Sequence, residues 1–177
     1  DRLGQRVIID NRPSGGGVAA AQAVATAPAD GYTIITLTNG TAISVSLFKS
    51  LPFDPVKDFV PISSVAYFDI LLLVNNSSPI KNVGDLLAAA KASGGTMNIG
   101  TINPGSTQNL SAELFKSVAG INAQIVPFKG SPDVQVALMR NDITVGFESY
   151  AALKGGIDAR DIRAIASSGV ERSQPDV

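Results

Sequence analysis

Residues 98–116 read NIGTINPGSTQNLSAELFK, and this stretch decides the fold. It opens as a strand, passes through a loop of small polar residues and continues as a helix. Pro104 and Gly105 break the strand, and Ser106 or Thr107 is well placed as the N-cap, because a hydroxyl there accepts a free N–H of the first turn. Exposed N–H groups and hydroxyls at a helix N-terminus can bind an anion such as a carboxylate. The same pattern is also typical of an ordinary strand–helix connection, so on its own it leaves both interpretations open.

The rest of the chain alternates short apolar segments with helix-prone ones. We expect strands over residues 6–10, 32–37, 65–74, 123–126, 143–147 and 162–166, and helices over 18–26, 42–49, 83–92, 107–118, 133–140 and 148–153. This alternation predicts an α/β fold with parallel-rich sheets and helices on both faces. In such sheets ligands bind beyond the carboxyl ends of the strands. The loops after Leu37, Gly100, Val126 and Phe147 are all small, polar and poor in charge, which suits binding better than chemistry.

Composition narrows the class of function. The 177 residues are 45% hydrophobic, enough for a core, and the net charge of -1 gives no argument for nucleic acid or an anionic membrane surface. Cysteine and histidine are both absent from the sequence, which excludes disulfides, a thiolate nucleophile, a Ser-His-Asp triad and the common zinc sites. Metal sites made of carboxylates alone, and carboxylate pairs that act as acid and base, remain possible by residue type. We therefore expect a binding protein and not an enzyme, with no catalytic residue, metal or cofactor, although an enzyme on an α/β scaffold remains an alternative.

Several motifs in a fixed order resemble those of a known family. The family segment ENRPGAGG corresponds to DNRPSGGG at residues 10–17, APDGYT to ADGYT at 29–33, LPYDPVKDFAPV to LPFDPVKDFVPI at 51–62, SGNGTSSHLAGELFK to INPGSTQNLSAELFK at 102–116, and VPYKGS to VPFKGS at 126–131. The match to the family runs over essentially all of the 177 residues. On these motifs the chain resembles the substrate-binding proteins of tripartite tricarboxylate transporters, the TctC or Bug family.

The resemblance implies a periplasmic binding protein of Venus flytrap architecture, with two α/β lobes that close on a small carboxylate and hand it to membrane transporter subunits. Residues 1–68 would belong to the first lobe, 69–167 to the second, and 168–177 to the return to the first lobe. Family members begin earlier and continue further, so we expect this chain to be a fragment with an incomplete first lobe, made deliberately or by proteolysis. We also expect the precursor to carry a signal peptide. A sensory receptor signalling to a membrane kinase and a fragment that binds nothing are the alternatives.

The resemblance also implies which residues bind the ligand. They are Gly40 and Thr41 in the first lobe, Thr101, Asn103, Gly105, Ser106 and Thr107 in the carboxylate loop of the second, and Gly130 and Ser131 on the neighbouring loop. Glu148 is a further candidate, because the family commonly has the shorter Asp after this phenylalanine, and the longer side chain would narrow the pocket or change the size of ligand accepted. Asn109 stands where the family usually has His. Dicarboxylates, tricarboxylates, amino acids and aromatic acids all fit such a neutral cleft.

Overall fold

The computed structural model describes residues 4–12, 14 and 17–170. The chain divides into two compact units, residues 1–62 and residues 63–177. Of residues 168–177, which were expected to return to the first lobe, residues 171–177 lie outside the described residues.

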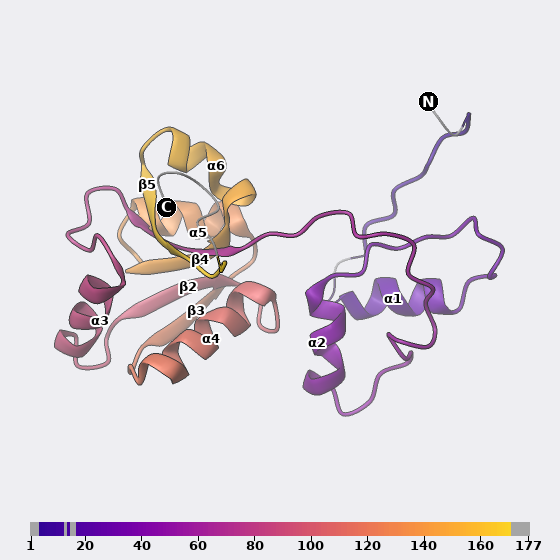
Figure 1. Ribbon diagram of the computed structural model, residues 1–177, viewed down its shortest axis with the longest axis horizontal. Helices are drawn as coiled ribbons and strands as arrows, with labels where there is room; N and C mark the ends of the chain where they lie inside the picture. The colour runs from indigo at the N-terminus through magenta and orange to yellow at the C-terminus, as the bar shows by residue number, and fades with distance from the viewer. Residues whose placement is uncertain (1–3, 13, 15–16, 171–177) are drawn as a thin grey trace. The chain divides into compact units, whose positions relative to one another are not determined.

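A five-stranded sheet forms the centre of the second unit (Figure 1). Its strands are β1 (Ile70–Asn75), β2 (Asn98–Ile102), β3 (Gln124–Phe128), β4 (Val145–Ser149) and β5 (Ile162–Ser167), in the spatial order β3-β2-β4-β1-β5. β2 runs parallel to β3 and β4, whereas β1 runs antiparallel to β4 and β5. The carboxyl ends of β2, β3 and β4 therefore lie at one edge of the sheet.

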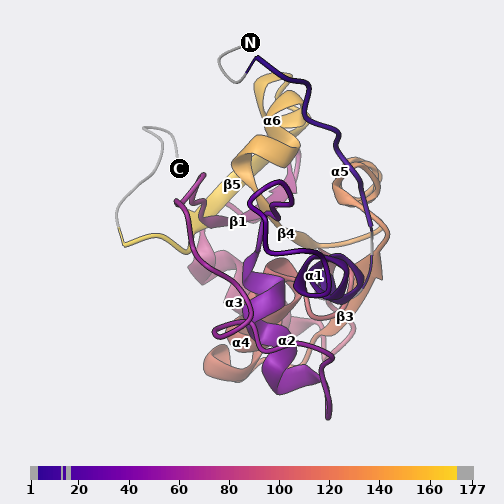
Figure 2. The ribbon, with the colours of Figure 1, turned by 90° about the vertical axis from the view of Figure 1, so that its right-hand side faces the viewer.

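Helices cover both faces of this sheet (Figures 1 and 2). The helices are α3 (Val83–Ala92), α4 (Thr107–Ala119), α5 (Ser131–Met139) and α6 (Tyr150–Asp158). Because successive side chains of a strand point to opposite faces, Ile70, Leu72 and Val74 of β1 pack in one core with α3 and α4, and Leu71 and Leu73 pack in the other with α5 and α6. A strand covered on both faces reads as a continuous apolar run, and β1 does.

The prediction of parallel strands is correct for β2, β3 and β4 and wrong for β1. The run at 70–74 is buried on both faces, and such a run fits a central strand of either direction, so its sequence carries no sign of polarity. The strands β3, β4 and β5 also end one or two residues later than expected. β3 passes through Pro127, which an edge strand tolerates because its N–H side need not pair. The helix expected over 148–153 begins only at Tyr150, so Glu148 lies in β4.

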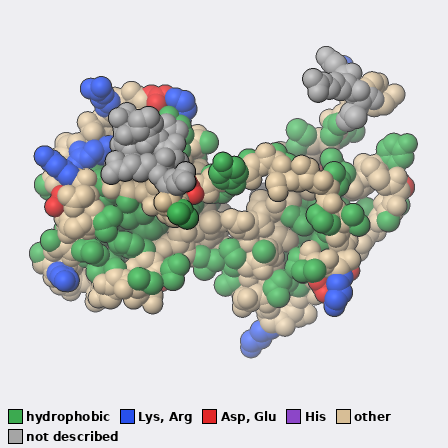
Figure 3. Space-filling model, in the orientation of Figure 1, with side chains coloured by type: hydrophobic (Ala, Val, Ile, Leu, Met, Phe, Trp, Pro, Cys, Tyr) green, Lys and Arg blue, Asp and Glu red, His purple; other side chains and the backbone are tan. Residues whose placement is uncertain are grey.

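In the described part of the first unit there are two helices, α1 (Val18–Ala25) and α2 (Asn39–Leu47). The strands expected over residues 6–10 and 32–37 are wrong: both segments lack regular structure, and the strand expected over 65–74 begins only at Ile70. A strand is stable only when neighbouring strands pair with it, and among the described residues neither of the two segments pairs. Apolar side chains from both consequently lie at the surface, as they do elsewhere in this unit (Figure 3), including Val7, Ile8, Ile9, Tyr32 and Ile34.

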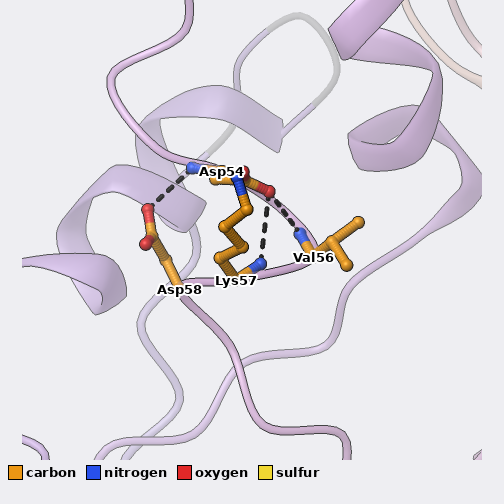
Figure 4. A network of polar contacts seen from close by, with 4 residues as sticks. All are labelled: Asp54, Val56, Lys57 and Asp58. Atoms are coloured by element: carbon orange, nitrogen blue, oxygen red, sulfur yellow. Dashed lines mark hydrogen bonds and ion pairs between the residues drawn. The ribbon is translucent and has the colours of Figure 1, made fainter.

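One aspartate fixes the proline-rich segment after α2 (Figure 4). Asp54 Oδ1 accepts the N–H groups of Val56 at 2.9 Å and Lys57 at 3.2 Å, and Asp54 Oδ2 lies 3.1 Å from Lys57 Nζ. The N–H of Asp54 donates to Asp58 Oδ2 at 2.7 Å. The buried Phe53 beside this turn meets the ring of Phe59 edge-on, with centroids 5.8 Å apart. The segment is therefore a closed turn of defined shape.

The stabilising contribution of the Asp54 carboxylate to this turn should be lost at low pH. The N–H of Val56 and then the ammonium of Lys57 hold the pKa of Asp54 below its ordinary value. A depressed folded-state pKa contributes stability that is present above the unfolded pKa and is lost as the pH falls through the folded one. We expect an NMR titration of the Asp54 carboxyl to give a lower midpoint in the folded chain than in the same chain unfolded in urea. Equal midpoints would show that the turn does not favour the ionised carboxylate.

Candidate functional site

The predicted carboxylate loop lies between the carboxyl end of β2 and the start of α4. Thr101 is fully buried within β2, one residue before the strand ends. The N–H of Ser106 donates to the carbonyl of Asn103 at 3.1 Å, which closes a turn. Gly105 within that turn has a φ of 80°, in the left-handed region that glycine adopts without strain. The loop is thus a tight, defined turn and not an open connection.

Ser106 is the N-cap of α4. Its hydroxyl accepts the N–H of Asn109 at 3.1 Å, and its carbonyl accepts the N–H of Leu110 at 3.0 Å. Helix geometry gives the first-turn N–H groups of Thr107 and Gln108 no partner within the helix. The N-terminus of α4 therefore carries two N–H groups and the positive end of the helix dipole, the arrangement that binds anions.

Asn109 holds the loop against the strand. Its Nδ2 donates to Thr101 Oγ1 at 3.3 Å, and its Oδ1 accepts the N–H of Gly105 at 3.1 Å. The sequence marked this asparagine only as a departure from the family, so its bracing role was missed. The available signal was a carboxamide in the first turn of a helix, which can donate and accept at once.

Glu148 in β4 connects this strand to α4 and α5 near the carboxyl end of β4. Its Oε1 accepts Gln108 Nε2 at 2.7 Å and the N–H of Ser149 at 2.7 Å, and its Oε2 accepts the hydroxyl of Ser131 at 2.6 Å. Glu148 is 0% exposed and Gln108 is 9% exposed, whereas Ser131 is half-buried. β4, α4 and α5 thus meet at a buried carboxylate. Sequence reasoning missed Gln108, which gave no signal because its partner lies 40 residues away.

The remaining predicted residues lie apart from this network. Gly130 directly precedes α5 with an extended backbone. Gly40 and Thr41 were expected in a loop before a helix at 42–49, but α2 already begins at Asn39, so both lie in its first turn. They belong to the first unit, where Thr41 is buried, and their share in a site with the second unit stays a prediction.

The comparisons with known proteins agree with the motifs. The sequence model of the tripartite tricarboxylate transporter family receptor, TctC, matches residues 1–177. The chain belongs to the TctC family. The TctC assignment made from the motifs is thereby confirmed, and it points to a receptor and not an enzyme, as expected from the residues.

Individual relatives extend the TctC match. The chain is 31% identical over 175 residues to the protein BugT of Bordetella pertussis, covering 98% of this chain and 54% of BugT. A Rhodopseudomonas palustris protein solved with adipate is 34% identical, with a TM-score of 0.85 over 97% of this chain and 57% of its own. MatC of the same organism, solved with bound malate, is 27% identical, with a TM-score of 0.81 over 96% of this chain and 58% of its own. The TctC chain thus spans little more than half of these relatives.

These structures confirm the α/β fold of a TctC-type binding protein. A further similar structure, 29% identical with a TM-score of 0.85, is that of a periplasmic transporter. Within the described part of this TctC chain, every helix is too short or too polar to cross a bilayer.

Proposed function

We propose that this chain is part of a periplasmic receptor that captures a small carboxylate for a tripartite tricarboxylate-type transporter. The observation that carries the proposal is the N-terminus of α4, where the N–H groups of Thr107 and Gln108 have no partner within the helix. Membership of a transporter receptor family and the adipate and malate in two similar structures support it.

In this proposal the second unit holds one carboxylate group of the ligand. The carboxylate oxygens accept from the N–H groups of Thr107 and Gln108 and from the Thr107 hydroxyl. Thr101 acts indirectly, because its hydroxyl meets Asn109, which in turn holds Gly105. Asn103, Gly105 and Ser106 shape the turn, and Gly130 and Ser131 line the neighbouring loop. Gly40 and Thr41 stay proposed ligand-binding residues of the first unit.

The family resemblance made Glu148 a candidate ligand-binding residue, and this proposal gives it a supporting role instead. Both of its carboxylate oxygens already accept hydrogen bonds from the protein, and the side chain is fully buried. We assign it to the support of the site and not to direct contact with the ligand.

Replacement of Thr107 by alanine tests the proposed contact. Loss of a hydrogen bond to a charged group should weaken carboxylate binding by about 1–2 kcal/mol. Isothermal titration calorimetry of the full chain with adipate and malate measures this effect, after a thermal-shift screen of carboxylates has found ligands that stabilise the chain. Thr96→Ala is the matched control, because exposed Thr96 precedes β2 at the opposite end of that strand. Equal affinity in the Thr107 variant and the control would refute the loop assignment.

A further inference from the structure

We infer that Glu148 fixes the direction of the Ser131 hydroxyl proton, so that the Ser131 oxygen offers the ligand a hydrogen-bond acceptor. The receptor then favours carboxylates that also carry a hydroxyl or ammonium donor. This inference rests on the proposed function, because it concerns the same site. It makes Glu148 a positioning residue that acts on specificity through Ser131.

With Glu148 as an ionised carboxylate, the hydrogen-bond pattern around it has only one consistent arrangement. Glu148 Oε1 faces the Nε2 group of Gln108 and the N–H of Ser149, each 2.7 Å away, and both groups can only donate. Ser131 meets the other oxygen, Oε2, at 2.6 Å. An ionised carboxylate has no proton to give, so the proton in this contact is that of the Ser131 hydroxyl.

The Ser131 hydroxyl therefore has only lone pairs left to offer. A serine hydroxyl carries one proton and two lone pairs, and here the proton is committed to a buried charge in a short, charge-assisted bond. Ser131 itself is half-buried, as the first residue of α5, so it is the member of the pair that solvent or a ligand can reach. A carboxylate oxygen placed against Ser131 meets lone pairs and is disfavoured, whereas an O–H or N–H group meets an acceptor.

The two helix starts at this edge thus differ in what they recognise. The start of α4 presents N–H donors and accepts a carboxylate, while the side-chain hydroxyl at the start of α5, that of Ser131, presents lone pairs. A ligand with a carboxylate and a nearby donor satisfies both. The preference predicted here is for hydroxy or amino acids over the same acids without the extra group.

Glu148→Gln reverses the direction of the hydrogen bond between residue 148 and Ser131, while the side chain keeps nearly the same shape. The two donors at the Oε1 position require the amide oxygen of the new side chain there, so its NH₂ group must occupy the Oε2 position and donate to Ser131. The Ser131 proton is then released to point outward. The variant replaces one carboxylate oxygen by an NH₂ group and removes the negative charge. It leaves Ser131 in place, so a change in ligand preference cannot come from lost volume.

Calorimetry with succinate and malate on the full chain, after circular dichroism has shown that each variant folds, tests the inference. Wild type should bind malate more tightly by about 2–12-fold, the value of one hydrogen bond, and Glu148→Gln should abolish or reverse that ratio. Glu148→Asp, which keeps an acceptor-only carboxylate, should retain the malate preference and provides a second test if the glutamine variant does not fold.

The Ser131→Ala background shows whether the effect passes through Ser131. There the malate-to-succinate ratio should be the same with glutamate or glutamine at residue 148. A ratio that Glu148→Gln leaves unchanged, or one that it changes equally without the serine, would overturn the inference while leaving carboxylate binding intact. Failure of wild type to bind any carboxylate would instead overturn the proposed function, and the inference with it.

Discussion

Replacement of Phe147 by alanine is expected to lower the free energy of unfolding by about 3–5 kcal/mol. Phe147 is 2% exposed on β4, a strand with neighbours on both sides, and it packs in the core shared with α3 and α4. Its ring lies 5.6 Å from that of Phe115, between centroids, in a tilted pair. The substitution removes this contact and leaves a cavity that neighbouring strands cannot close.

Urea unfolding followed by circular dichroism at a helical wavelength measures the loss. Leu114→Ala on α4 is the matched control, because Leu114 is 65% exposed and its truncation removes little buried surface. A Phe147 variant within 1 kcal/mol of that control, on the scale of typical surface substitutions, would mean that the second unit is not packed as described.

Replacement of Gly100 by alanine should cost about 1–3 kcal/mol through overpacking. A Cβ at this position would lie 2.2 Å from Ile143 Cδ1 and 3.3 Å from Phe128 Cε2. Ile143 is 3% exposed and belongs to the core of α5 and α6, so its side chain has little room to turn away. The glycine is needed here for space and not for an unusual backbone angle.

A double-mutant cycle with Ile143→Val tests this contact, because valine lacks the atom that collides. The valine change alone should cost about 0.5–1.5 kcal/mol, and in the Gly100→Ala chain it should restore part of the lost stability. Unfolding free energies of the four chains give the coupling between the two positions. Strictly additive costs would show that the clash with Ile143 is not the cause.

The sequence could predict those elements whose determinants are local. The helix expected over 83–92 is confirmed at both ends, because Asn82 caps it by accepting the N–H of Asp85 and Lys91 lies in its last turn. The turn before α4 is equally local, with a glycine where φ is positive and a serine as the cap.

Features that depend on distant partners could not be predicted. Glu148 reads as the first residue of a helix, yet it is a buried strand residue whose charge is stabilised by Gln108 and Ser131, 40 and 17 residues away. The expected strand at 32–37 has the right residues but no strand beside it among those described. Local propensity decides a helix start, whereas a strand or a buried charge also requires the neighbour that completes it.

The chain enters the second unit through β1 and leaves the sheet through β5, and these strands are antiparallel neighbours. At their shared end the N–H of Ile70 donates to Ser168 Oγ at 2.9 Å, and the N–H of Ser168 donates to the carbonyl of Ile70 at 2.8 Å. A mechanical load applied through these two ends pulls on that first pair alone. The ladder then opens one rung at a time, as a zipper does, instead of resisting as a whole in shear. We therefore expect the second unit to yield at low force to tension applied at these two ends.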